Sequence, residues 1–105
     1  MSEHIYNVTI VVNPVIEERW NAWMKKEHIP QVMETGMFHS FVFTQVFPEQ
    51  EQDHPSYSIQ YRSADLESIK LYIQLYAPDL REKSTKAWGE HALAFRTILE
   101  VLDEK

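Results

Sequence analysis

Residues 4–13 read HIYNVTIVVN, and the fold can be worked out from this stretch. It is rich in β-branched residues whose apolar side chains recur at every second position, a pattern typical of a β-strand with one buried face. The apolar side consists of Tyr6, Val8, Ile10 and Val12. Asn13 and Pro14 follow, a helix-capping residue before a proline that suits the first helical position. The sequence therefore predicts a strand over 4–13 that leads directly into a helix.

An amphipathic helical region is predicted over 14–35. Ile16, Trp20 and Trp23 recur at spacings of four and three residues and so share one apolar face. Pro30 lacks a backbone N–H, so we expect a kink there or a second short helical piece beginning there. Gly36 is expected to end the region in the left-handed conformation.

The rest of the chain repeats the strand, helix, strand plan. Alternating or β-branched apolar residues mark three further strands, and apolar residues three and four apart mark a second helical region, broken at Pro78 and ended at Gly89. The polar stretch PEQEQDHP between the second and third strands is expected to form an exposed loop. The predicted bounds are strands 37–47, 56–62 and 91–102 and a helical region over 63–88.

The element order βαββαβ predicts an α+β fold of the ferredoxin-like type. Two such split βαβ units form a four-stranded antiparallel sheet with both helices on one face, here as a single domain over 1–105. The other face is left uncovered, and a large exposed apolar patch is rare on a soluble monomer. We therefore expect a second copy of the chain to cover it, as a homodimer through the sheet face. The residues expected on that face are Val11, Phe41, Phe43 or Val42, Ile98 and Leu102.

The composition excludes several classes of function. The 105 residues include 10 Lys and Arg against 16 Asp and Glu, a formal net charge of -6 that disfavours binding to nucleic acid or an anionic membrane surface. There is no Cys, which excludes disulfides, thiolate nucleophiles and Cys-based metal sites. Residues MSEHIYNVT show no basic region followed by an apolar one, and no run of about 18 uncharged apolar residues occurs, so the protein is expected to be soluble and cytoplasmic.

Several stretches resemble known proteins. WNAWMKKEHIPQVMETGMF over 20–38 resembles the first helix and following strand of dimeric α+β barrel proteins, the superfamily that includes antibiotic-biosynthesis-type monooxygenases. Later segments resemble a bacterial family of about this length that is known as a domain of unknown function. They are YSIQY at 57–61, Tyr72, APDLR at 77–81, Trp88 with Gly89, and AFRTILE at 94–100. The resemblance implies a ferredoxin-like protomer whose sheet pairs with that of its twin to form a barrel.

Histidine is the first candidate for chemistry. The five His residues show no metal-ligand spacing, so no metal site is predicted, and glycines at only two positions exclude the common nucleotide-binding loops, so no cofactor is predicted. His28 lies one turn after Met24 on or beside the apolar helix face. There it is either an acid, base or ligand that titrates near neutrality, or a structural residue that caps the broken helix.

Polar residues on the strands form a second candidate. They are assigned to the sheet face away from the helices, where Arg96 would anchor a carboxylate ligand. The other interpretation of Arg96 is an ion pair across a dimer interface, with Glu34 or Glu100 of the partner subunit. The residues of this group are Asn7, Thr9, Ser58, Gln60, Arg62 and Arg96.

The resemblance suggests a third candidate. In superfamily members that oxidise substrates, a pocket between sheet and helices uses an Asn, a Trp and a His together, and Asn7, Trp88 and His91 supply these types here. The predicted function is binding of a small anionic or aromatic metabolite in a barrel or sheet–helix pocket. One alternative is a cofactor-independent monooxygenase or isomerase with His28 or His91 as the base. The other is a structural or regulatory dimer without ligand, so enzymatic activity stays open.

Overall fold

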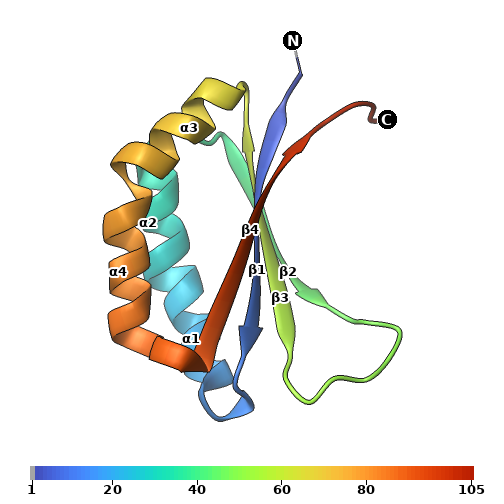
Figure 1. The fold of residues 1–105 in the computed structure, drawn as a ribbon, viewed down its shortest axis with the longest axis vertical. Helices are drawn as coiled ribbons and strands as arrows, with labels where there is room; N and C mark the ends of the chain where they lie inside the picture. The colour runs from blue at the N-terminus through green and yellow to red at the C-terminus, as the bar shows by residue number, and fades with distance from the viewer. Residues whose placement is uncertain (1) are drawn as a thin grey trace.

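A computed structural model describes residues 2–105, and its strands form one antiparallel sheet (Figure 1). The strand order is β2-β3-β1-β4, with β1 paired to both β3 and β4. This confirms the predicted α+β, ferredoxin-like arrangement. The strands are β1 His4–Val12, β2 Ser40–Val46, β3 Ser56–Ser63 and β4 Ala92–Glu100.

The helices all lie on one side of the sheet, as Figure 1 shows. None of those within residues 2–105 combines the length and the apolar character needed to cross a membrane. Each of the two helical regions is broken. The first comprises a 3₁₀ turn Pro14–Ile16, α1 Glu17–Trp23, a π-helical segment Met24–His28 and α2 Ile29–Glu34; the second comprises α3 Leu66–Leu75, α4 Ala77–Trp88 and a 3₁₀ turn Gly89–His91.

The first helical region begins and breaks where the sequence indicates. The Asn13 side chain accepts a hydrogen bond from the Val15 N–H at 2.9 Å and caps the first turn. Pro30 has no N–H to donate to the preceding turn, and a wider π-helical turn ends two residues before it, at His28. Gly36 has a φ of 77°, which is the left-handed conformation expected after a helix end.

The second helical region starts later than predicted. Asp65 caps α3 by accepting a hydrogen bond from the Ser68 N–H at 2.8 Å, whereas Ser63 belongs to β3 and is buried. The break falls between Leu75 and Ala77, just before Pro78, which occupies the first turn of α4.

The hydrophobic core lies between the sheet and the helices. The alternation in β1 and β3 holds in the structure, because every second side chain of both strands is buried. Trp20 and Met24 are almost fully buried and pack onto this layer, with the Trp20 ring 4.9 Å from the Tyr57 ring centroid. The central strand residues of this core are Tyr6, Val8, Ile10, Val12, Tyr57, Ile59 and Tyr61.

The other sheet face is open, but several residues expected there lie on the helix side. Phe41 pairs with Tyr61, Phe43 pairs with Ile59 and Ile98 pairs with Tyr6, and directly opposed residues share a face. The prediction was wrong for these three because β2 and β4 are apolar on both sides, so only pairing with β1 and β3 decides which side faces the helices. The large apolar residues exposed on the open face are Val42, Val46, Leu93, Phe95 and Leu99.

Ile59 provides a test of this core. It is 0% exposed at the centre of β3, so Ile59→Val should lower the free energy of unfolding by about 0.5–1.5 kcal/mol through a lost methylene and a small cavity. Urea denaturation measures the change. Ile98→Val is the matched control, because Ile98 is 43% exposed on the edge strand and should lose less. Equal losses at the two sites would contradict the assignment of the core.

Candidate functional site

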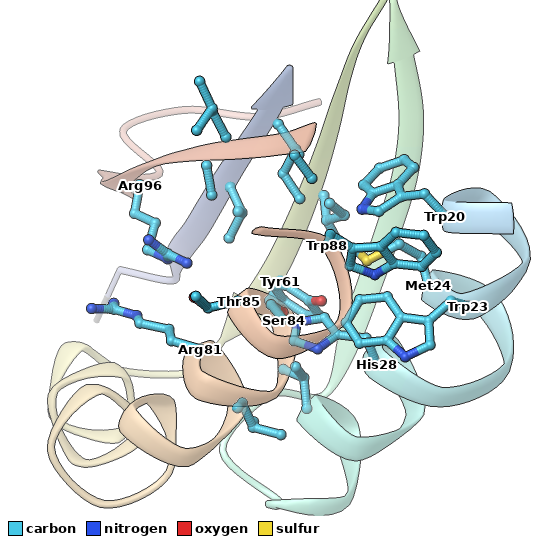
Figure 2. A pocket seen from close by; sticks show the side chains of 18 of the residues that line it. Trp20, Trp23, Met24, His28, Tyr61, Arg81, Ser84, Thr85, Trp88 and Arg96 are labelled. Atoms are coloured by element: carbon cyan, nitrogen blue, oxygen red, sulfur yellow. The ribbon is translucent and has the colours of Figure 1, made fainter. Parts of the chain in front are cut away.

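A pocket of about 360 Å³ opens between the sheet and the helices (Figure 2). Its floor comes from the buried side of β1, β3 and β4, and its walls come from both helical regions. The lining combines apolar and aromatic residues with a few polar side chains, the composition typical of a small-molecule site. The pocket is therefore the candidate functional site.

Aromatic rings form one end of the pocket. The His28 ring stacks on Trp23 with centroids 5.0 Å apart and an interplanar angle of 21°. Trp23 meets Trp88 edge to face at 5.7 Å, so α1, the π-helical segment and α4 each contribute one ring. Packed rings of this kind form a rigid aromatic wall at this end of the pocket.

Two arginines form the other end. Figure 2 shows Arg81 of α4 and Arg96 of β4 together at the side of the pocket away from the tryptophans. Arg81 donates a hydrogen bond to the Tyr6 hydroxyl at 3.0 Å. Within residues 2–105 neither guanidinium forms a salt bridge with a carboxylate. Partial burial, followed by the nearby charge of Arg81, lowers the pKa of Arg96.

Three residues that line the pocket each hold a buried polar atom without a partner. Among residues 2–105, Nδ1 of His28, Nε1 of Trp88 and Nε of Arg81 are buried without a hydrogen-bond partner. Buried polar groups are almost always paired, so these three atoms are exceptions among the residues that line the pocket.

The environment of His28 keeps its imidazole neutral. Burial lowers its pKa from the usual 6.5 to about 4, and the positive charge of Arg96 adds to the effect. Burial likewise raises the pKa of Tyr61 and of Tyr72, so both phenols stay protonated. At neutral pH His28 is therefore the uncharged base of the pocket, and the tyrosines serve as hydrogen-bond donors or acceptors.

Three of the predicted site residues meet in this pocket: His28, Trp88 and Arg96. Arg96 was assigned to the face away from the helices, and that assignment was wrong. It pairs with Val8, whose side chain is buried under the helices, so Arg96 lies on the helix side. This position also removes it from the sheet face on which an interface ion pair was expected.

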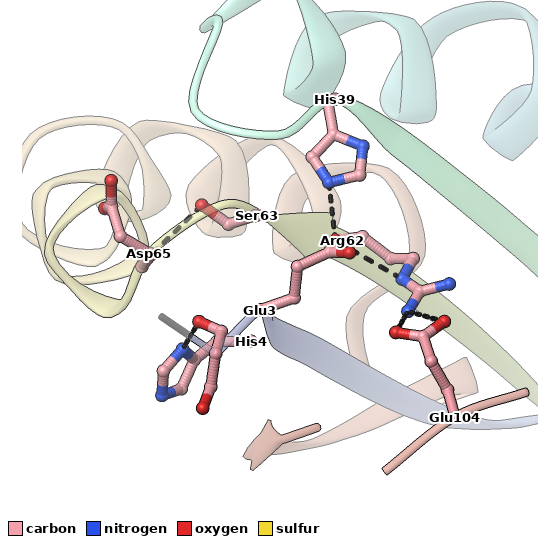
Figure 3. Close-up of polar contacts among 8 residues, drawn as sticks. Glu3, His4, His39, Arg62, Ser63, Asp65 and Glu104 are labelled. Atoms are coloured by element: carbon pink, nitrogen blue, oxygen red, sulfur yellow. Dashed lines mark hydrogen bonds and ion pairs between the residues drawn. The ribbon is translucent and has the colours of Figure 1, made fainter. Parts of the chain in front are cut away.

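Asn7, Gln60 and Arg62 lie on the open face and do not reach the pocket. Asn7 is held within the sheet, because its Oδ1 accepts a hydrogen bond from Ser58 at 2.8 Å. Arg62 is used in an ion-pair cluster, where its terminal nitrogen lies 3.1 Å from Glu104 and its Nε lies 3.6 Å from Glu3 (Figure 3). Glu3 also contacts His39 at 2.7 Å.

The proposed grouping of Asn7, Trp88 and His91 is not assembled. Asn7 faces the open side of the sheet, Trp88 lines the pocket, and His91 is an exposed residue of a 3₁₀ turn. The His91 ring contacts Asn13 at 3.3 Å instead. The prediction failed because Gly89 ends α4 between Trp88 and His91, so the two residues belong to different helical segments.

Sequence reasoning missed Arg81 and Tyr6 as site residues. A signal for Arg81 was present, since Arg81, Ser84, Thr85 and Trp88 are spaced by three, four and seven residues and so share one face of α4. Tyr6 could not be separated from its neighbours by pattern, because it belongs to the same apolar row as the core of β1. The described residues contain no group of three or more His, Asp or Glu that could hold a metal ion.

A family model for a domain of unknown function, DUF4286, matches residues 3–102, almost the whole chain. The chain belongs to the DUF4286 family. No curated protein matches it. This DUF4286 protein therefore has an established family and fold, and the pocket has to be interpreted from its own residues.

Solved structures share the fold at low sequence identity. A dimeric ferredoxin-like protein from an uncultured marine organism superposes with a TM-score of 0.78 at 17% identity, covering 100% of both chains. SnoaB, a cofactor-independent oxygenase from Streptomyces nogalater, gives 0.67 at 10%, covering 99% of this chain and 97% of its own. A putative antibiotic biosynthesis monooxygenase from Bacillus cereus gives 0.62 at 14%, covering 100% and 98%. At such identities the likeness establishes the fold alone.

The lowered pKa of His28 predicts a specific pH dependence of stability. His28 takes up a proton more readily in the unfolded state than in the folded state. The free energy of unfolding is therefore highest above pH 6.5 and decreases as the pH falls toward 4. Between pH 7 and pH 4.5 the titration of His28 alone should lower the free energy of unfolding by about 2–3 kcal/mol. Urea denaturation at both pH values should show a smaller loss for His28→Gln, which cannot titrate. An NMR titration that places the His28 pKa at 6.5 or above would contradict the prediction.

Proposed function

We propose that this DUF4286 protein binds a small aromatic anion in the pocket between its sheet and its helices, and that it does so as a homodimer. The observation that carries the proposal is the pair Arg81 and Arg96, two guanidiniums without a carboxylate partner within residues 2–105, at one end of an aromatic pocket.

The charge of this pair favours an anionic ligand. Two like charges side by side repel each other, and an anion placed between them relieves the repulsion. Guanidiniums suit a carboxylate, because their planar donors match its two oxygens. The Tyr6 hydroxyl accepts from Arg81 and keeps its own proton free to donate to the same anion.

The rest of the pocket favours an aromatic body on the ligand. Trp23, Trp88 and the ring of His28 form a packed surface against which a flat molecule can stack. The volume of about 360 Å³ lies within the range of small-molecule sites.

The open sheet face supports the homodimer. It carries Phe95, 62% exposed, with Leu93 beside it on the edge strand β4 and Val42 on β2. Asn7 and Ser58 lie on the two central strands between these edges, and Asn7 forms hydrogen bonds with both Ser58 and Thr97 of β4. A second copy would remove the apolar side chains from water without leaving these polar groups unpaired.

A cofactor-independent monooxygenase or isomerase is the second candidate. The observation that favours it is the neutral, buried imidazole of His28 within the pocket, since a base of this kind can take a proton from a bound substrate. Turnover of a bound aromatic acid, followed by mass spectrometry, would distinguish this enzyme from a binding protein.

The arginine pair predicts ligand selectivity. Millimolar 2-naphthoate should raise the melting temperature of the protein, because a ligand that binds only the folded state stabilises it. Arg81→Ala and Arg96→Ala should each weaken binding about tenfold or more, as expected for a lost charged hydrogen bond. Calorimetric titration measures the affinities. Arg19→Ala is the matched control, because Arg19 is an exposed residue of α1 outside the pocket, and it should bind as the wild type does.

The contrary result is equally clear. If neither 2-naphthoate nor other aromatic carboxylates raise the melting temperature, or if both arginine variants bind as well as the wild type, the pocket does not hold an aromatic anion. The protein would then be better described as a structural or regulatory dimer without ligand.

The open face predicts a mass of twice 12.5 kDa in solution. Phe95→Glu places a charge at the centre of the exposed apolar row and should shift the protein to one chain, because a buried carboxylate without a partner is unfavourable. Light scattering coupled to gel filtration measures the mass. Val15→Glu is the control, since Val15 is 83% exposed outside the sheet. A wild-type mass of one chain, or a Phe95→Glu dimer, would refute the interface.

A further inference from the structure

We propose that the ligand of this pocket is an aromatic phosphate monoester, and that Arg81 and Arg96 bind its doubly charged phosphate from the helix side and from the sheet side. The inference rests on the proposed function and narrows its aromatic anion to one ligand class. It is carried by two guanidiniums that share one end of the pocket, in whose wall, among residues 2–105, there is no Asp or Glu.

The charged groups of the pocket sum to two positive charges. Both guanidiniums stay protonated at neutral pH, and the third basic side chain among the described lining residues, His28, is neutral at pH 7. Asp and Glu outnumber Lys and Arg by 16 to 10 in the chain, yet none of the described lining residues is acidic. A monoanion balances one of these two charges, whereas a phosphate dianion balances both.

The two guanidiniums lie close to each other. Arg81 donates a hydrogen bond to the Tyr6 hydroxyl at 3.0 Å. Burial has the largest effect on the pKa of Arg96, the charge of Arg81 lowers this pKa further and Tyr6 opposes the shift, so Arg96 lies near both residues. Figure 2 shows the two guanidiniums together on one side of the pocket. One compact head group can therefore contact both.

The groups at this end are mainly hydrogen-bond donors. A guanidinium has no acceptor, and the Tyr6 hydroxyl, which accepts from Arg81, still has its own proton to donate. A single guanidinium in bidentate contact already uses both oxygens of a carboxylate. A phosphate offers three strongly accepting oxygens, enough to meet two guanidiniums and a hydroxyl. The donor set therefore favours a phosphate over a carboxylate.

The arginine end is also open enough to admit a strongly hydrated group. Arg96 and Thr85 are exposed, and Arg81 and Ser84 are only partly buried. A dianion is costly to remove from water completely, but here its phosphate can keep part of its hydration while the aromatic body enters the pocket. The opposite end of the pocket, with Trp88, is aromatic and suits that body.

Matched ligands test the inference. Calorimetric titration at pH 7.5 compares 2-naphthyl phosphate, which is a dianion at this pH, with 2-naphthyl sulfate. The sulfate also has three terminal oxygens on a tetrahedral centre but carries a single negative charge. The phosphate should bind about tenfold tighter or more, because only its second charge balances the second guanidinium.

A change of pH repeats the comparison with one ligand. A phosphate monoester loses its second proton near pH 6, so at pH 5 most of it carries one charge. His28 stays mostly neutral at pH 5, since its pKa is about 4, and Tyr61 and Tyr72 stay protonated. The affinity for the phosphate should therefore fall about fivefold from pH 7.5 to pH 5, while that for the sulfate changes less than about twofold. Circular dichroism checks that the protein is folded at both pH values.

Two variants connect the preference to the residues. Arg81→Ala and Arg96→Ala each leave one positive charge, so in each the preference for phosphate over sulfate should fall to about threefold or less. Because the two ligands are compared within one variant, a general loss of stability does not imitate this effect. Arg19→Ala is again the matched control and should keep the full preference, since Arg19 is an exposed residue outside the pocket.

The outcomes separate this inference from the proposed function. Equal affinities for the phosphate and the sulfate at pH 7.5, with binding still dependent on Arg96, would overturn the phosphate site and leave the aromatic anion site standing. The same conclusion would follow if both ligands lost affinity equally at pH 5, or if the preference persisted in both arginine variants. Absence of binding by 2-naphthoate, the sulfate and the phosphate would overturn the proposed function and this inference together.

Discussion

The pairing of Val8 with Arg96 is the constraint on which the pocket depends. β1 lies between β3 and β4, so its register fixes which side chains of both neighbours face the helices. A slip of one residue would exchange Arg96 for Phe95, placing an aromatic ring under the helices and a guanidinium on the open face. The register therefore decides both that the pocket carries a charge and that the open face is apolar.

The broken helices give the pocket its other walls. The π-helical turn before Pro30 places His28 where it stacks on Trp23, and Gly89, which has a positive φ, ends α4 at Trp88. A π-helical turn holds one more residue than an α-helical turn, so a regular helix would place His28 on a different side of the helix from Trp23. The interruptions thus lie at the positions that shape the aromatic end of the pocket, and π-helical turns are frequent at functional sites.

Much of the fold followed from local patterns, whereas the site did not. The alternation in 4–13 and 56–62 and the signals at Pro14, Gly36 and Gly89 are local, because they depend on residues a few positions apart. The side assigned to Arg96 was wrong because β4 has apolar residues on both of its faces. The small Ala92 and Ala94 face the helices, while the bulky Phe95 faces outward. The contact of Arg81 with Tyr6 joins residues 75 positions apart, which no local pattern reveals.

Local signals were enough to predict the element order, the buried rows of the two central strands and the breaks in both helical regions, since propensity, periodicity and backbone chemistry act over short distances. The face of β4 that lies inward, the histidine that is buried and the arginines that meet became known from the folded chain alone. These depend on strand register and on packing between distant segments. For the same reason the chemistry of His28 emerged only with its burial, because a pKa is set by the groups and the solvent around a residue and not by its neighbours in the chain.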